Sequence, residues 1–596
     1  MLEVREEPGG EEPVEVEQVA TPVRRSMMDM FRRGGVEMAL STSVLESIEK
    51  KIEGDLSDCV MNITVKQALK TRGEEAEKVI MKELSQMVDK RVWRPVHVHR
   101  LSAQDRGRII RSQMFLKEKY LPTGQFEKLK ARLVAGGNEQ DKGLYEDLYS
   151  PTVSTSAVLT VLALAAHENR RIAVVDITGA YFNADMGTDI AVHMRLDPLI
   201  SGLMMKLCND YARFADERGC IVVRLQKALY GCIESAALWH DNQSETMREL
   251  GYEKNKHEEC VFNRRTKEGT QCTVALHVDD LLITSASGQL IDELCAGLRL
   301  KYGEVTRSDG PVVNYLGMTF DLRVKGEAKV TMKGYIQDAL DASGTTGLAA
   351  SPAIDQLFNV RDTAHVSEEE RVKFHSMVAK LLYLAKRTKP ECLTAVSFLA
   401  TRVTRCTADD IGKLTRLVRY IRRTKDRGVV LIPGLLGIQV RVFVDAAFGV
   451  HADCRSHTGS CVVIGDTGAV HCRSSKQTSA TKSSTEAELM AVSDSANQGL
   501  YLRHFLRDQG HDTGPVTIYQ DNTSTIALLA RGRPGAERSR HIDIRHFWLH
   551  DKVKDKEAII VHLGTKEMYA NVLTKPLQGK QFAYERDCLT GWKDGK

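Results

Sequence analysis

Cysteine pairs at metal or disulfide spacing are missing from this sequence. Its 13 cysteines are scattered, and none belongs to a Cys-x-x-Cys pair or stands beside histidine at a spacing typical of zinc ligands. These absences exclude a readable zinc knuckle and a disulfide framework. We therefore expect a reducing, intracellular compartment.

Long hydrophobic runs are missing as well. The most apolar stretch, AVLTVLALAA at 157–166, is about half as long as a bilayer crossing requires. The N-terminus has no apolar signal region. We expect a soluble protein with no membrane partner.

An excess of one charge is also lacking. The net charge of +4 is the small difference between 83 basic and 79 acidic side chains, so any surface that binds nucleic acid must be formed locally. The first 20 residues contain seven glutamates, and four arginines follow before residue 34. We expect residues 1–58 to be mostly disordered.

What is present is a series of patterns typical of folded domains. The length of 596 residues suggests roughly three or four domains. Strand-like and helix-like runs alternate over 105–285, helical spacing dominates 371–425, and a second mixed block covers about 439–580. These patterns predict a multidomain protein of the α/β and α+β class.

Two segments of the first block deliver carboxylates at strand ends. RRIAVVDITGAYF predicts a strand that ends near Asp176, and CTVALHV and LLITS predict a tight hairpin with Asp279 and Asp280 between its strands. If the hairpin lies beside the first strand, three carboxylates converge, and such oxygen ligands suit Mg²⁺ or Mn²⁺. The alternative is an ordinary exposed turn.

The second block repeats this arrangement. VRVFVDAAFG and VTIYQDNTS predict strands that end near Asp445 and Asp521. On the helix predicted from SSTEAELMAVSDS, Glu488 lies within about 40° of Val492, whereas Glu486 lies roughly 160° away from Glu488. Glu488 therefore borders the packed face, and we expect it to complete a metal site with the two aspartates.

These motifs carry a family resemblance. VVDITGAYFNADM, LQKALYGCIESAALWH, HVDDLLIT and NYLGMTF, in this order, resemble the reverse transcriptase of copia-type LTR retrotransposons. The resemblance extends to LKARLVAGGNEQ, KSSTEAELMA, RHIDIRHFWLHDKV and LTKPL, and it covers about 60–582. It implies a right-hand polymerase with fingers, palm and thumb, a connection, and a C-terminal RNase H-like domain.

The resemblance implies roles for residues of the first site. Asp176 and Asp279 would be the principal metal ligands, with Asp280 beside them, and Tyr181 would stack under the incoming sugar. Lys130 and Arg132 are candidates for the triphosphate, or else belong to a solvated strand edge. Gly231 would leave room for the template or nucleotide, or would be a turn glycine.

At the second site, Asp445, Glu488 and Asp521 would cut the RNA strand of a hybrid. The family has a carboxylate where this chain has Asn571, whose amide oxygen could still coordinate a cation. His541 could contact the scissile phosphate or be structural. Two further departures from the family are His277 before VDD and IESAA at 233–237, where Glu234 replaces expected cations and would weaken phosphate binding.

The helix predicted from KLTRLVRYIRRTKDR carries a stripe of arginines that fall within roughly 80°. Its members are Arg416, Arg419, Arg423 and Arg427. The stripe could track the phosphates of a hybrid between the two sites, or be a solvated helix face.

The predicted division of the chain is as follows. Residues 59–290 form fingers and palm, 291–370 a thumb-like region, 371–438 a helical connection, 439–582 the RNase H-like domain and 583–596 a tail. The chain would be a processed piece or a truncated copy of a Gag-Pol polyprotein.

The implied activity is RNA-directed DNA polymerisation, a nucleotidyl transfer, with ribonuclease H cleavage, each site using two Mg²⁺ or Mn²⁺ ions. The implied partners are RNA template, primer, RNA:DNA hybrid, deoxynucleoside triphosphates and other Gag-Pol products. The implied location is a cytoplasmic virus-like particle with possible nuclear access.

One alternative is a decayed or domesticated copy that binds nucleic acid without turnover. The RNase H-like sequence motifs disfavour a group II intron or non-LTR reverse transcriptase.

Overall fold

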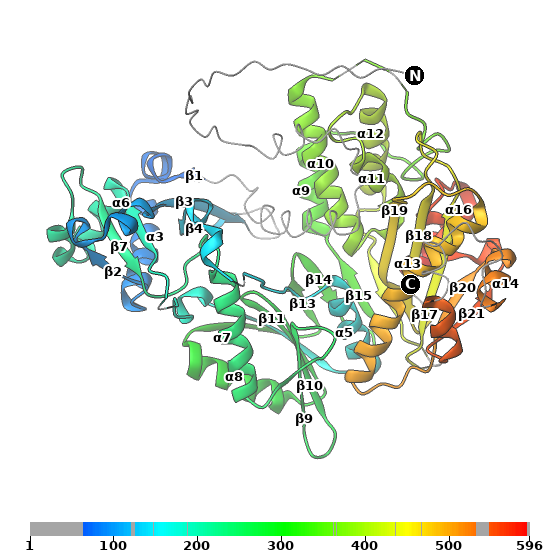
Figure 1. Cartoon of the computed structure of the whole chain (residues 1–596), viewed down its shortest axis with the longest axis horizontal. Helices are drawn as coiled ribbons and strands as arrows, with labels where there is room; N and C mark the ends of the chain where they lie inside the picture. The colour runs from blue at the N-terminus through cyan, green and yellow to red at the C-terminus, as the bar shows by residue number, and fades with distance from the viewer. Residues whose placement is uncertain are drawn as a thin grey trace, which may run out of the picture.

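The computed structural model describes residues 63–592 apart from 121–125, 147, 188, 362, 365, 435–436, 467 and 532–547. The segment 1–58, which we expected to be disordered, and the candidate His541 lie outside the described residues. The described residues form four sheets with helices packed on them (Figure 1). The predicted α/β and α+β multidomain class is confirmed.

The first lobe, blue and cyan in Figure 1, has a six-stranded sheet in the order β1-β3-β6-β7-β2, with β4 paired to β3. Its strands are β1 (Ile63–Thr64), β2 (Trp93–Val96), β3 (Ile110–Tyr120), β4 (Phe126–Ala135), β6 (His193–Leu196) and β7 (Ile221–Leu225). Its helices are α3 (Val65–Asp89), α4 (Ala103–Gly107) and α6 (Pro198–Leu207). Helix α3 packs on β3 and β4 and buries one apolar face there.

The second sheet, in the order β12-β5-β11-β10-β9-β8, carries the first candidate site. Its strands are β5 (Arg171–Ile177), β8 (Glu253–Lys254), β9 (Val261–Arg265), β10 (Gln271–His277), β11 (Asp280–Ser285) and β12 (Val305–Asp309). Helices α7 (Ser235–Glu249) and α8 (Gly288–Tyr302) accompany it. Helix α8 packs on β5, β11 and β12.

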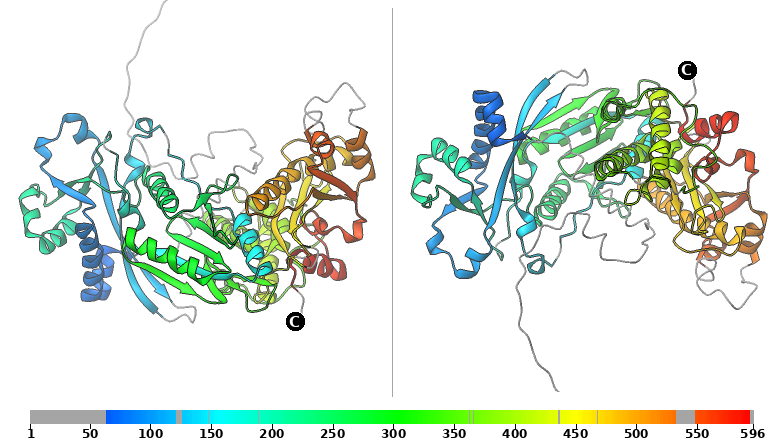
Figure 2. Two further views of the ribbon diagram at one scale, coloured as in Figure 1. Left: turned by 90° about the horizontal axis from the view of Figure 1, so that it is seen from below. Right: turned by 90° about the horizontal axis from the view of Figure 1, so that it is seen from above.

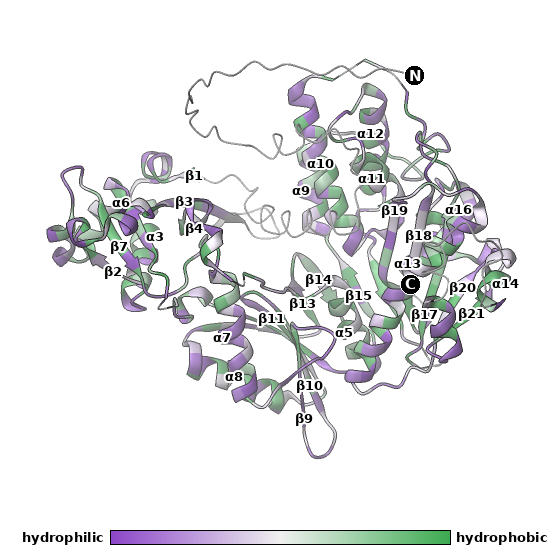
Figure 3. Ribbon diagram, in the orientation of Figure 1, coloured by the Kyte–Doolittle hydropathy of each residue, from purple (hydrophilic) through white to green (hydrophobic). Residues whose placement is uncertain are grey.

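Helix α5 (Thr155–His167) contains the most apolar stretch of the chain and is buried almost throughout. It packs against β10 and β11 on one side and against β19 of the last sheet on the other. Its apolar character is visible in Figure 3. A helix that is hydrophobic all round is buried either in a membrane or in a core, and here it is buried in the core between two sheets.

A small third sheet, β13-β14-β15-β16, and a group of helices link the second sheet to the last one. The strands are β13 (Val312–Tyr315), β14 (Met318–Asp321), β15 (Ala328–Thr331) and β16 (Val429–Leu431). The helices are α9 (Lys333–Ser343), α10 (Glu368–Arg387), α11 (Leu393–Ala400) and α12 (Ala408–Arg423). The segment 371–438, predicted as helical, therefore also contains the strand β16.

The last sheet has the order β19-β18-β17-β20-β21, in which β17, β20 and β21 are parallel and β18 and β19 antiparallel to their neighbours. Its strands are β17 (Val440–Ala447), β18 (His457–Ile464), β19 (Ala469–Lys476), β20 (Val516–Gln520) and β21 (Ala558–His562). Its helices are α13 (Ser484–Asp508), α14 (Thr523–Arg531) and α16 (Gly579–Thr590).

Short 3₁₀ helices occur at several places in the described chain. They are η1 (Val98–Arg100), η2 (Gly137–Glu139), η3 (Lys142–Leu144), η4 (Ala180–Asn183), η5 (Asn209–Phe214), η6 (Pro390–Cys392), η7 (Thr565–Glu567) and η8 (Tyr569–Leu573).

The first lobe and the last sheet lie at opposite ends of the molecule, with the second sheet between them (Figures 1 and 2). The first lobe has a hydrophobic core of its own, whereas a single continuous core runs from the second sheet through the helices to the last sheet. Within the described part of the chain, no helix has both the length and the apolarity to cross a bilayer.

Candidate active sites

The first site lies at one end of the second sheet, where β5 meets the β10–β11 hairpin. Asp176 is the last but one residue of β5, and Asp280 opens β11. These two residues are direct partners in the antiparallel pairing of the strands. Asp279 lies in the hairpin turn, where its carbonyl oxygen accepts a 3.1 Å hydrogen bond from the Ile177 amide. The fold therefore brings all three predicted residues to one end of the sheet.

The hairpin turn begins one residue earlier than the sequence predicts. His277 pairs with Asp280, so the turn consists of Val278 and Asp279 rather than of the two aspartates. The reason is that Asp280 is held in the ladder by both its neighbours, His277 and Asp176. Val278 takes a positive φ of 56°, a conformation that is unfavourable for a β-branched residue.

Burial and a neighbouring charge both act on Asp279. Burial raises the pKa of its carboxyl group and the charge of Asp176 raises it further, while the cations Arg132 and Lys130 lower it. Lys130 and Arg132 lie two residues apart on β4 and thus on the same face of that strand. A divalent cation at this end of the sheet would offset the repulsion between the carboxylates of Asp176 and Asp279.

Two tyrosines lie beside Asp279. Burial and the charge of Asp279 raise the pKa of Tyr181 to about 12, and the same two causes raise the pKa of Tyr230. Their ring centroids lie 4.6 Å apart in an edge-to-face arrangement, and the Arg132 guanidinium carbon lies 4.3 Å from the Tyr230 ring centroid. Sequence reasoning missed Tyr230, although it stands next to Gly231 in the motif LYGCIES.

Gly231 and Glu234, near this site, both contact the chain itself. For Gly231 the structure agrees with the alternative of a turn glycine, because its φ is 92° and a Cβ there would lie 2.2 Å from the Ala135 carbonyl oxygen of β4. Glu234, expected to repel phosphates, is buried. Its carboxylate accepts hydrogen bonds from Gln140 Nε2 at 2.9 Å and from the Tyr145 hydroxyl at 3.2 Å, so it serves the packing of the chain.

The second site is a cluster of three carboxylates on the last sheet. Asp445 lies on β17, Glu488 on α13 and Asp521 directly after β20, and one ligand oxygen of each lies within 4.8 Å of the others. Glu486 instead accepts a hydrogen bond from the Lys482 amide at the start of α13. The choice of Glu488 over Glu486 thus agrees with the geometry.

The carboxylates of this cluster repel one another in a buried place. Burial, followed by the charges of Asp445 and Asp521, raises the pKa of Glu488 to about 8. Gln520 Nε2 donates a 3.2 Å hydrogen bond to the Glu488 carboxylate, and the Thr565 hydroxyl donates a 2.8 Å bond to Asp521. Three oxygen ligands at this density fit Mg²⁺ or Mn²⁺. Among the described residues, no other three carboxylates gather this closely, so the three of the first site do not all lie within 4.8 Å of one another.

Asn571 lies beside this cluster and is linked to Asp445 through Lys575. Its amide nitrogen donates to the carbonyl oxygens of Thr565 at 2.7 Å and Met568 at 2.9 Å and to Glu585 at 3.2 Å. Its amide oxygen accepts a 2.7 Å bond from Lys575 Nζ. That this oxygen coordinates a cation stays a prediction. Its partner here is the Lys575 ammonium group, which also lies 3.1 Å from Asp445.

Sequence reasoning also missed the two residues that hold Asp445. The Thr574 hydroxyl donates to one carboxylate oxygen, and Lys575 Nζ lies 3.1 Å from the other. Both belong to LTKPL, one of the motifs that carry the family resemblance. Lys575 brings a positive charge to the site that the strand-end aspartates alone do not predict.

The predicted arginine stripe is not one open surface, and Arg427 lies beyond α12, which ends at Arg423. Arg416 donates to the Ser351 hydroxyl at 3.0 Å, Arg419 donates to the Thr346 carbonyl at 2.8 Å, and Arg427 forms an ion pair with Asp587. Arg419 and Arg423 are exposed, while Arg416 and Arg427 are partly buried. The prediction of a continuous four-arginine track is therefore wrong for Arg416 and Arg427, which hold neighbouring segments in place.

Comparisons with known proteins agree on one class. Residues 102–354 match the family model described as reverse transcriptase (RNA-dependent DNA polymerase). The chain is 25% identical over 463 residues to the retrovirus-related Pol polyprotein from transposon TNT 1-94 of Nicotiana tabacum, a match that covers 76% of this chain and 33% of that protein. It is also 25% identical over 535 residues to the transposon Ty1-MR1 Gag-Pol polyprotein of Saccharomyces cerevisiae. That match covers 85% of this chain and 29% of that protein.

A solved structure of the foamy viral protease-reverse transcriptase in complex with an RNA/DNA hybrid is similar at a TM-score of 0.41 and 11% identity, covering 73% of this chain and 49% of that one. The chain spans about a third of the length of the polyproteins that it matches. Residues 102–354 are thus a reverse transcriptase domain, and the chain is a homologue of the Pol polyproteins of copia-type transposons over most of its length.

Proposed function

We propose that the chain copies RNA or DNA into DNA at the first site and cleaves the RNA of RNA:DNA hybrids at the second. The observation that carries the polymerase proposal is the meeting of Asp176, Asp279 and Asp280 at one end of the second sheet, inside the matched range 102–354. The observation behind the nuclease proposal is the cluster of Asp445, Glu488 and Asp521.

Asp176 and Asp279 would hold Mg²⁺ or Mn²⁺ at the first site, and the second cluster would do so for the nuclease. Two bound ions supply charge that activates an attacking hydroxyl and stabilises the leaving oxygen. Lys130 and Arg132, whose charges already act on Asp279, would bind the triphosphate. Tyr181 would pack against the sugar of the incoming nucleotide, a role supported by its place beside Asp279.

At the second site, Thr574 and Lys575 would orient Asp445 through the hydrogen bonds described above. The positive charge of Lys575 supports a phosphodiester substrate, because Lys575 stands next to the carboxylates and could approach a phosphate oxygen.

The proposed partners are an RNA template, a primer, deoxynucleoside triphosphates and other Gag-Pol products, in a virus-like particle. The proposed division into fingers, palm, thumb, connection and RNase H-like domain does not follow the sheets at every boundary. Strand β12 pairs with β5 although it lies beyond residue 290, and α16 begins before residue 583.

Primer extension on an RNA template with Mg²⁺ tests the polymerase proposal. We expect extension by the intact protein and its loss, by at least about a hundredfold, in Asp279→Asn, while binding of primer and template persists. Equal extension by both proteins would refute the site. No extension by either, with hybrid binding retained, would favour the alternative of a non-catalytic copy.

Cleavage of a labelled RNA:DNA hybrid tests the nuclease proposal. Glu488→Gln should abolish cleavage because it removes a charged metal ligand. Glu486→Gln is the matched control, since the same change two residues earlier affects only the start of α13. Cleavage that survives Glu488→Gln but not Glu486→Gln would reverse the assignment.

A further inference from the structure

The turn that carries Asp279 has a conformation that its own residues do not favour. Val278 has a φ of 56°, and two-residue hairpin turns with positive φ strongly prefer glycine, asparagine or aspartate at such a position. A β-branched residue in this region raises the energy of the turn. Contacts from outside the hairpin must therefore hold it.

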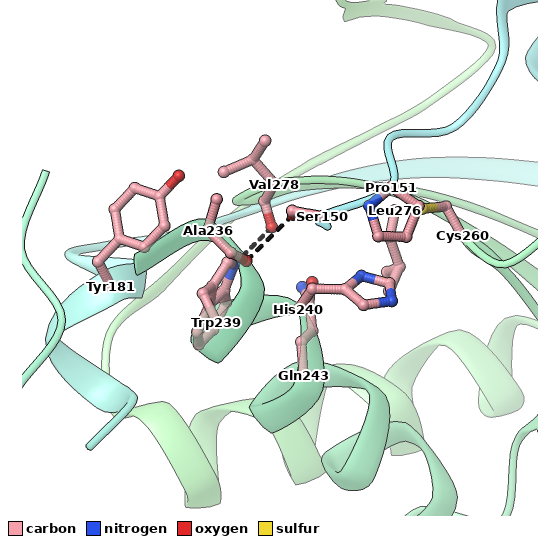
Figure 4. A pocket seen from close by; sticks show the side chains of 10 residues that line it. All are labelled: Ser150, Pro151, Tyr181, Ala236, Trp239, His240, Gln243, Cys260, Leu276 and Val278. Carbon is pink, nitrogen blue, oxygen red and sulfur yellow. Dashed lines mark hydrogen bonds between the residues drawn. The ribbon is translucent and has the colours of Figure 1, made fainter. Parts of the chain in front are cut away.

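Trp239 on α7 makes such a contact. Its indole Nε1 donates a 2.7 Å hydrogen bond to the carbonyl oxygen of Val278, as Figure 4 shows. The side chain is almost fully buried, with 1% exposure. Because the donor is buried and Val278 is partly buried, loss of this bond would remove the indole partner of the carbonyl.

The indole is itself held in place by α8. The Tyr302 ring lies edge-on to the Trp239 ring, with centroids 5.2 Å apart. The Tyr302 hydroxyl donates to Thr246 Oγ1 at 2.7 Å, which ties the pair back to α7. The donor that meets Val278 is thus part of a packed unit and does not depend on a freely rotating side chain.

The next peptide group of the turn is fixed from the other side. The Asp279 carbonyl accepts its hydrogen bond from the Ile177 amide at the end of β5, next to Asp176. Two successive carbonyl groups, those of Val278 and Asp279, are therefore anchored to different elements. The backbone between them determines the direction in which the Asp279 carboxylate leaves the turn.

We infer that Trp239 is a positioning residue, whose indole N–H holds the unfavourable Val278 turn so that Asp279 faces Asp176. The effect of Trp239 on nucleotide addition rests on the proposed polymerase function, whereas its effect on the turn does not. The motif LWH contains this tryptophan, but its sequence context alone indicates only a buried aromatic residue. The inferred role belongs to the N–H group, beyond the packing of the ring.

A double-mutant design separates this role from ordinary packing. Trp239→Phe keeps an aromatic ring and removes the donor. Val278→Asn replaces the β-branched residue by one that tolerates positive φ. We would compare the effect of Trp239→Phe in the Val278 chain with its effect in the Val278→Asn chain. Trp93→Phe, at a buried tryptophan of β2 in the first lobe, is the matched control.

Amide hydrogen exchange is the first readout, on peptides that cover 173–180 and 276–284. In Trp239→Phe these amides should exchange about tenfold faster, and the increase should shrink to about twofold when Val278→Asn is also present. Trp93→Phe should leave both peptides unchanged. Unchanged exchange in Trp239→Phe, or an equal increase in both backgrounds, would show that Trp239 only fills the core.

Nucleotide addition is the second readout. Trp239→Phe should lower kcat about tenfold with the KM for primer-template unchanged, and the loss should be smaller in the Val278→Asn background. An equal loss of kcat in both backgrounds would overturn the inference. If the wild-type chain adds no nucleotides, the polymerase proposal fails, while the exchange experiment still decides whether Trp239 holds the turn.

Discussion

At the scale of single residues, Asn571 is bound into the structure through its whole amide group. Its nitrogen donates to two backbone carbonyls and to the buried Glu585, and its oxygen faces Lys575. An aspartate here would direct a carboxylate oxygen at three acceptors. Restoring the family's acidic residue would therefore disturb this chain.

We predict that Asn571→Asp lowers the free energy of unfolding by about 3 kcal/mol, because the two amide hydrogens that serve three acceptors are lost and these contacts become repulsive. Chemical denaturation of the metal-free protein measures this. Adding Glu585→Gln, which supplies a donor in place of a carboxylate, should recover part of the loss. An Asn571→Asp protein as stable as the wild type would contradict the orientation of the amide.

The pH dependence of the second site follows from Glu488. Its pKa lies at about 8 in the folded chain, against 4.5 for an ordinary glutamate. Between these two values the folded state binds the extra proton, so stability contributed by this group is present at low pH and is lost as pH rises toward 8. Mg²⁺ competes with that proton, and its affinity should rise over the same interval.

We therefore predict that the metal-free wild type loses thermal stability relative to Glu488→Gln as pH increases from about 5 to about 8. Thermal denaturation at several pH values, with and without Mg²⁺, checks this. Added Mg²⁺ should reverse the loss in the wild type and have a smaller effect in the variant. A difference between the two proteins that does not change with pH would contradict the raised pKa of Glu488.

At the scale of elements, the end of β4 is fitted against the loop at Gly231. The Ala135 amide donates a 2.7 Å hydrogen bond to the Tyr230 carbonyl, and Gly231 has a φ of 92°. Tyr230 therefore reaches Tyr181 and Arg132 only because the next residue has no side chain. The glycine supports the first site by permitting this close approach.

We predict that Gly231→Ala destabilises the protein by at least about 3 kcal/mol, since it combines a positive φ with a clash against Ala135. Gly269→Ala is the matched control, because Gly269 also has a positive φ of 87° but has no atom within 4 Å of the added Cβ. That change should lose about 1 kcal/mol. Equal losses in a denaturation experiment would show that the contact with β4 does not matter.

At the scale of the whole molecule, the last sheet is joined to the second one by polar as well as apolar contacts. The Tyr501 hydroxyl on α13 donates a 2.5 Å hydrogen bond to Glu258, and Gln271 donates a 2.8 Å bond to Gln509. Helix α5 lies in the shared core. The two candidate sites are therefore carried by one packed body, whereas the first lobe has its own core.

We predict that the first lobe unfolds separately from the rest. Leu133→Ala, in the core of the first lobe, and Leu282→Ala, in the shared core, each remove a fully buried side chain and should destabilise their own unit by about 2–5 kcal/mol. Calorimetry should show Leu133→Ala moving one transition and Leu282→Ala the other. A single transition that both changes shift equally would contradict two independent cores.

The sequence by itself determined the fold class, the strands that carry Asp176, Asp445 and Asp521, and the glutamate that joins the second cluster. It could do so because these features follow from local hydrophobic periodicity. Tertiary structure alone decided that β16 pairs with β15, that the hairpin turn begins at Val278, and that Gly231 and Glu234 face the chain's own interior. Contacts between residues far apart in the chain also decided that Lys575 binds Asn571 and that Trp239 meets Val278, because no local pattern encodes which distant donor satisfies a buried acceptor.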